Sequence, residues 1–135
     1  MILSADSRTT AGVILLTIVA IEWGGHFMLR VVRGSQLATE FQKAFFRAGH
    51  AHAGVLVILS LVCLLIVDAA RLSGPLALLA RNAIPAAAIL MSAGFFLSAI
   101  GRGAEKPNRL ILLLYLGAAS LAVGVVSLGI GLLAG

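Results

Sequence analysis

The sequence predicts an all-α, polytopic membrane protein with four transmembrane helices and an interfacial amphipathic helix between the first and the second. The first observation is composition: of 135 residues, 61% are hydrophobic and 11% charged, and the mean hydropathy is +1.11. A soluble domain carries about a quarter charged residues. The second observation is that the charged residues divide the chain into four apolar blocks of membrane-spanning length. Since only helices satisfy the backbone of an open chain in hydrocarbon, we expect one four-helix transmembrane domain over residues 1–135.

Charged residues set the limits of the expected spans, which are 9–29, 48–67, 82–101 and 110–134. The leader MILSADSR contains an acid as well as a base, and no small-residue cleavage pattern follows. We therefore expect the first span to be a mature helix rather than a cleaved signal peptide. Cys63, the single cysteine, lies in the middle of the second span, where we interpret it as a small core residue.

The segment 35–47 has helical periodicity of its own. One face is apolar and the other polar, and Ser35 is placed to cap the first turn. The apolar face is formed by Leu37, Phe41, Ala44, Phe45 and Ala48, and the polar face by Gln36, Glu40, Lys43 and Arg47. This pattern predicts an amphipathic helix lying on the inner leaflet.

Lysine and arginine are unevenly distributed over the connections. The first and third connections hold seven of them, whereas the opposite side holds Arg8, Arg71 and Arg81. By the positive-inside rule both termini are expected outside the cytoplasm. The net charge of +5 is thus interpreted as a topology signal, and we expect no nucleic-acid partner.

Small residues recur at three- and four-residue spacing in the last two spans. They allow close approach of helix backbones, either within the bundle or in an oligomer or larger complex. The fourth span has Ser120, Gly124, Ser127, Gly131 and Gly135, and the third has Ala83, Ala87, Gly94, Ser98 and Gly101.

The residues with distinctive chemistry gather on the expected cytoplasmic side. All eight aromatic residues, the three histidines and Glu22 fall there. Glu22 lies eight residues before Arg30, about 12 Å inside the boundary at the rise of an α-helix. A carboxylate at that depth must be protonated, paired or hydrated. Gly24 and Gly25, next to it, would admit another backbone or a ligand closely.

Four residues at similar depth are candidate metal ligands: Glu22, His26, His50 and His52. Residues two apart on a regular helix point about 200° away from each other. Glu22 and His26 with one of the two other histidines therefore make the easier site, suited to iron, zinc or copper. Alternatively, imidazoles beside Trp23, Phe27 and Phe96 would suit haem or a quinone head group. A structural hydrogen bond between Glu22 and His26 is the third interpretation.

Two resemblances bear on these expectations. The stretch VAIEWGGHFMLR resembles the first helix of small multidrug resistance transporters, whose membrane glutamate exchanges protons for cationic drugs. The long first connection and the extra histidines depart from that family. The runs FFRAGHAHAGVLVILSLV and PNRLILLLYLGAASL are similar to small, uncharacterised four-helix membrane proteins of high-GC bacteria, which implies a bacterial plasma membrane protein.

No phosphate-binding glycine loop, nucleophile with a histidine base, or close carboxylate pair is found in the sequence. We therefore expect a non-enzymatic accessory or assembly subunit of a larger transport or respiratory complex, associated with other membrane subunits or with copies of itself. The alternatives are a metal-, haem- or quinone-binding membrane protein that uses the glutamate and histidines, and a small proton-coupled transporter that uses Glu22.

Overall fold

The computed structural model describes residues 3–134 and is all-helical over that range. Its helices are α1 (Ala5–Val32), α2 (Glu40–Ala69), α3 (Gly74–Ser98) and α4 (Ile111–Ala134). Each is long and apolar enough to cross a membrane. The expected all-helical class, with four helices of membrane-spanning length and hydropathy, is confirmed at this level.

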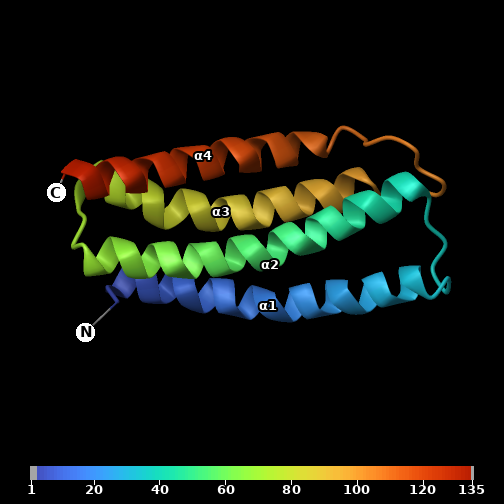
Figure 1. Ribbon diagram of the computed structural model, residues 1–135, viewed down its shortest axis with the longest axis horizontal. Helices are drawn as coiled ribbons and strands as arrows, with labels where there is room; N and C mark the ends of the chain where they lie inside the picture. The colour runs from blue at the N-terminus through green and yellow to red at the C-terminus, as the bar shows by residue number, and fades with distance from the viewer. Residues whose placement is uncertain (1–2, 135) are drawn as a thin grey trace.

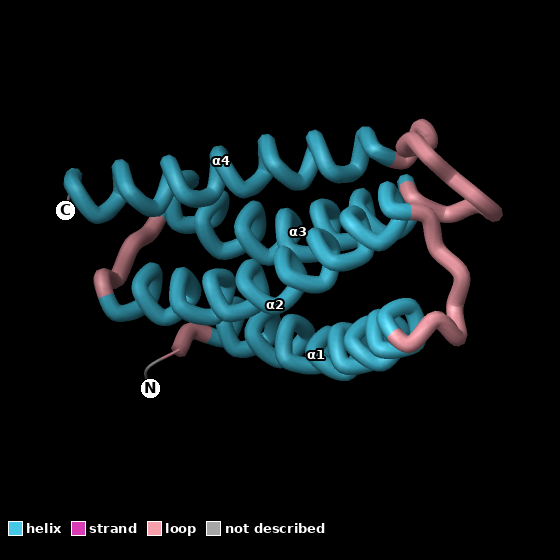
Figure 2. Tube along the Cα trace, turned by 45° about the vertical axis from the view of Figure 1, so that its right-hand side comes forward, coloured by secondary structure: helices cyan, strands magenta, loops and turns pink. Residues whose placement is uncertain are grey.

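The helices form a row in chain order, and neighbours run antiparallel (Figure 1). The α1–α2 and α3–α4 connections lie at one end of the molecule, and the α2–α3 connection and both termini lie at the other (Figures 1 and 2). Helix α3 packs extensively on α2 and α4, whereas α1 packs mainly on α2 and touches α3 only lightly. α1 is therefore the least covered helix, with only Ser7, Ile14 and Val31 buried.

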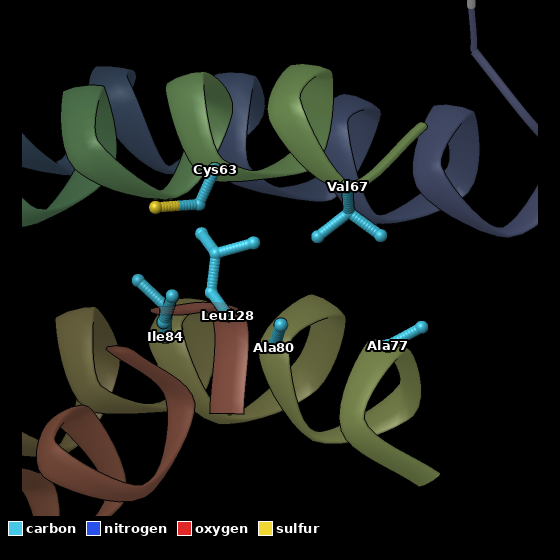
Figure 3. Close-up of a cluster of buried hydrophobic side chains, with 6 residues drawn as sticks. All are labelled: Cys63, Val67, Ala77, Ala80, Ile84 and Leu128. Atoms are coloured by element: carbon cyan, nitrogen blue, oxygen red, sulfur yellow. The ribbon is translucent and has the colours of Figure 1, made fainter. Parts of the chain in front are cut away.

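Two apolar clusters hold the bundle together. In the first, Cys63 and Val67 of α2 meet α3 and α4 around Ile84 and Leu128 (Figure 3). The second joins Ile14 of α1 to α2 and α3. Cys63 is 5% exposed, in agreement with its interpretation as a core residue.

The small residues of α4 face α3. A Cβ placed on Gly117 would lie 2.5 Å from the Met91 Cγ, and one on Gly124 would lie 3.0 Å from the Ile84 backbone nitrogen. The Ser120 hydroxyl donates a hydrogen bond of 2.8 Å to the Ala83 carbonyl. The small-residue pattern thus serves packing inside the bundle; its last member, Gly135, lies outside the described residues.

The third helix begins well before the expected span of 82–101 and ends at Ser98. The sequence analysis took Arg81 as a boundary, but it lies inside α3 and its Nη2 is 2.7 Å from the Asp68 Oδ1. The Arg81 Nε also donates to the buried Ser7 hydroxyl at 3.3 Å. Because opposite charges on α2 and α3 neutralise each other, the arginine does not mark the end of the helix.

A separate amphipathic helix over 35–47 is not formed. Residues 35–39 belong to the connection, and residues 40–47 are the first turns of α2, which continues without interruption to Ala69. The cap is Thr39, which forms a capping box with Gln42, while the Ser35 hydroxyl donates to the Arg30 carbonyl at the end of α1. Gly49 and Gly54, which follow residue 47, keep helical geometry and do not interrupt α2.

Candidate functional site

A cavity of about 270 Å³ lies between α1, α2 and α3, and α1 and α3 make few contacts with each other. Its wall is mainly apolar. The polar or aromatic side chains that line it are Thr17 of α1, His50 of α2, and Ser92 and Phe96 of α3. His50 comes ten residues after Glu40, the first residue of α2, and therefore lies about 15 Å along that helix.

The His50 ring lies directly over the backbone of α1. A Cβ on Gly24 would lie 3.5 Å from the His50 Nδ1, and one on Gly25 would lie 3.3 Å from its Cε1. Larger side chains at these positions would push the imidazole away or displace α1. The missing side chain at Gly25 therefore makes room for the histidine, whereas a Cβ on Gly24 would be in ordinary van der Waals contact with it.

The Nδ1 atom of His50 is buried and has no hydrogen-bond partner among the described residues. The hydroxyls that share the cavity are already bonded: Thr17 donates to the Ile14 carbonyl at 2.6 Å, and Ser92 to the Ala88 carbonyl at 2.7 Å. A buried polar atom without a partner costs about 1–3 kcal/mol. His50 is thus the cavity residue with unused hydrogen-bonding capacity.

A second cavity of about 380 Å³ adjoins the first and shares Gly24 and Phe96 with it. The three aromatic residues expected to flank a cofactor, Trp23, Phe27 and Phe96, all line this cavity. Phe46 of α2 also contributes: it stacks on Phe96 at a centroid distance of 5.8 Å and meets Phe27 edge-on at 5.1 Å. Together the two cavities form an aromatic-walled groove along α1 and α3.

His52 does not reach this groove. Its Nδ1 donates a hydrogen bond of 2.7 Å to the Ala48 carbonyl, one turn back in α2, and its ring packs on Phe95 at a centroid distance of 4.9 Å. As expected for residues two apart on a regular helix, His50 and His52 face different neighbours.

Glu22 and His26 lie on the outer surface of α1, where both are exposed. The ion pairs formed by described side chains, Glu40–Lys43 and Asp68–Arg81, do not include Glu22. Within residues 3–134, no three His, Cys, Asp or Glu side chains come close enough to hold a metal ion. The expected four-residue metal centre is therefore not assembled within this chain.

Two features were missed from the sequence, one beside the groove and one at the other end of the bundle. Phe46 was assigned to an interfacial helix, but it lines the groove. The sequence signal for its observed position was that Phe46 and Gly49, three residues apart, share one face of α2. The second feature is at the opposite end of the bundle, where the Asp68 Oδ2 accepts a hydrogen bond of 2.8 Å from the Ser4 backbone and Oδ1 pairs with Arg81.

The geometry thus gives a groove with an aromatic wall and, among the buried side-chain atoms of the described residues, one imidazole nitrogen without a hydrogen-bond partner. Comparison with known proteins returned no matching protein family, no similar curated protein and no similar solved structure.

Proposed function

We propose that this protein binds a lipophilic molecule of the quinone class, with the head group in the cavity between α1, α2 and α3. The observation that carries the proposal is the buried Nδ1 of His50, which lacks a hydrogen-bond partner among the described residues and belongs to a side chain that lines the cavity. Once the ring turns to bring this nitrogen to the cavity surface, a quinone carbonyl would accept a hydrogen bond from a protonated Nδ1, and a quinol hydroxyl would donate one to the other tautomer.

The size and chemistry of the cavity favour this ligand over the other two that the residues suggested. Ligand pockets usually measure about 300–1,000 Å³, so a cavity of about 270 Å³ suits a single ring better than a haem macrocycle. A structural or catalytic zinc ion needs three or four protein ligands, and one imidazole does not provide them. The adjoining cavity of about 380 Å³ would take the first part of an isoprenoid tail against Trp23 and Phe27.

The other functions expected from the sequence have less support. Docking onto a larger complex through the small-residue faces was one basis for an accessory role, but in α4 that face packs on α3. Proton-coupled transport through Glu22 would place this carboxyl in a substrate pathway, and Glu22 lies outside both cavities.

For the membrane setting, we propose a bacterial plasma membrane with both termini outside the cytoplasm. Seven lysines and arginines lie in the connections and helix ends at one end of the bundle: Arg30, Arg33, Lys43, Arg47, Arg102, Lys106 and Arg109. The first turns of α2 carry Lys43, which is half-buried, and Arg47, which is exposed, and these turns would cross the head-group region there.

The test uses the fluorescence of Trp23, the single tryptophan of the chain. Trp23 lines the adjoining cavity, so a short-tail ubiquinone analogue bound beside it should quench its emission. We expect saturable quenching of the purified protein in nanodiscs. The His50→Leu variant should bind the analogue about tenfold more weakly, because one hydrogen bond to a buried group is lost.

The matched control is His52→Leu, since His52 already bonds the Ala48 carbonyl and lies away from the cavity. It should bind the analogue with the affinity of the unmodified protein. Quenching that never saturates, or that weakens equally in both variants, would contradict the proposal. If protein extracted mildly from its native membrane showed a Soret band or contained a stoichiometric metal, the ligand would be haem or a metal and not a quinone.

A further inference from the structure

The outer face of α1 carries a continuous stripe of exposed residues that the ligand cavity does not use. They recur at alternating four- and three-residue spacing, and we call them the α1 outer stripe: Leu15, Val19, Glu22, His26 and Leu29. The three apolar members are 51%, 64% and 51% exposed. This spacing is that of the seam of a left-handed coiled coil.

The residues that face the bundle lie on the opposite side of the same helix. Ile14 is buried, and Thr17, Ile21 and Gly24 are half-buried against α2 and α3. The α1 outer stripe is therefore fully available when the cavity is occupied, and an interface formed there does not depend on the proposed ligand.

Two members of the stripe cannot be left facing lipid. Glu22 lies ten residues before the end of α1 at Val32, about 15 Å along the helix, and it has no ion-pair partner among the described residues. An ionisable side chain at membrane depth almost always faces a partner or a water-filled cavity. In a parallel coiled-coil seam, residue 22 packs in the same layer as residue 22 of the other helix. Residue 26 of that helix lies in the next layer, about 6 Å further along the axis, where a glutamate side chain that leans toward it reaches its imidazole.

We infer that two copies of this chain associate in parallel through the α1 outer stripe, and that Glu22 of each copy pairs with His26 of the other. A second copy satisfies both polar residues at once because the same stripe supplies an acid and a base one turn apart. Copies inserted in the same orientation, as the concentration of lysine and arginine at one end favours, present their α1 helices in parallel.

Disulfide cross-linking in native membranes tests the interface. With Cys63→Ala as background, the full chain has no other cysteine. We expect rapid covalent dimer formation for Val19→Cys, which lies in the stripe. We expect none for the matched control Val13→Cys, which is 54% exposed and points about 120° away from Val19 around the helix. Equal cross-linking of the two, or none at position 19, would overturn the inference.

A second measurement tests the pairing itself. Light scattering in mild detergent gives the mass, and so the oligomeric state, of the unmodified chain and its variants. The unmodified chain should be dimeric. Glu22→Ala should weaken the dimer about tenfold, which is the effect of losing interhelical hydrogen bonds in a membrane. The double variant Glu22→His with His26→Glu exchanges the partners and should restore it. A monomeric unmodified chain, an unchanged dimer in Glu22→Ala, or a swap that restores nothing would each overturn the pairing.

Discussion

Replacing Gly117 by alanine tests whether the contact between α3 and α4 depends on the absence of a side chain. The new Cβ would lie 2.5 Å from the Met91 Cγ and 2.7 Å from the Met91 backbone nitrogen. Carbon atoms pack best at about 3.5–4.0 Å, so the helices must separate locally by about 1 Å or Met91 must change its rotamer. The Met91 side chain can move, but its backbone nitrogen cannot move without displacing α3.

The expected loss can be worked out from this geometry. Overpacking by one methyl group costs about 1–3 kcal/mol, and a gap of about 1 Å opened around it forfeits up to half of the dispersion energy of the contacts that separate. We expect the free energy of unfolding to fall by about 2 kcal/mol, which is about a 30-fold change in the unfolding equilibrium.

The assay is reversible unfolding of the protein in mixed micelles by a denaturing detergent, followed by circular dichroism. The matched control is Gly129→Ala on the same helix, where a Cβ would meet nothing within 4 Å. Alanine is the better helix former by up to about 1 kcal/mol, so the control should be neutral or slightly stabilised. The reasoning would be refuted if both variants changed stability alike, or if Gly117→Ala were as stable as the unmodified protein.

Three further predictions concern buried polar and reactive groups. Gln42→Leu should lower the free energy of unfolding by about 2 kcal/mol, because its buried Nε2 donates to two carbonyls at the end of α3, at 2.9 and 2.8 Å; hydrogen exchange should rise at that end and not at the α2–α3 turn. Arg81→Gln should cost about 3 kcal/mol, since it leaves the Asp68 side chain, 5% exposed, without its partner. Adding Asp68→Asn should recover part of that loss in a double-mutant cycle, and strict additivity of the two losses would argue against coupling. The Cys63 thiol should resist maleimide in the folded protein and react upon unfolding, because it is 5% exposed among apolar side chains; fast labelling of folded protein would contradict the packing in Figure 3.

The sequence was sufficient for the number and position of the helices because hydrophobic length is a local property. The apolar blocks of at least about 20 residues could satisfy their backbones in hydrocarbon only as helices. It was less reliable at helix ends. Asp68 was taken as a boundary and α2 does end beside it, at Ala69, whereas Arg81, taken as a boundary too, lies inside α3 and pairs there with Asp68.

The candidate site, too, was predictable from the sequence only in part. Helical periodicity alone indicated that His50 and His52 point apart, and the structure agrees, with one over α1 and the other on Phe95. The sequence could also gather Trp23, Phe27 and Phe96 at one depth, because depth follows from distance along a helix. It could not tell which side of α1 faces α2, and so it placed Glu22 and His26 with His50 although they lie on the outer surface.

The sequence by itself therefore determined that the chain has four helices of membrane-spanning length and that its histidines, Glu22 and its aromatic residues lie toward one end. The tertiary structure decided which of them meet. The physical reason is that the rotation of a helix about its axis depends on close contacts with its neighbours, here on Gly24 and Gly25 against the His50 ring and on Gly117 against α3. Because α1 carries apolar residues on its exposed face as well, such as Leu15, Val19 and Leu29, hydrophobicity leaves that rotation open.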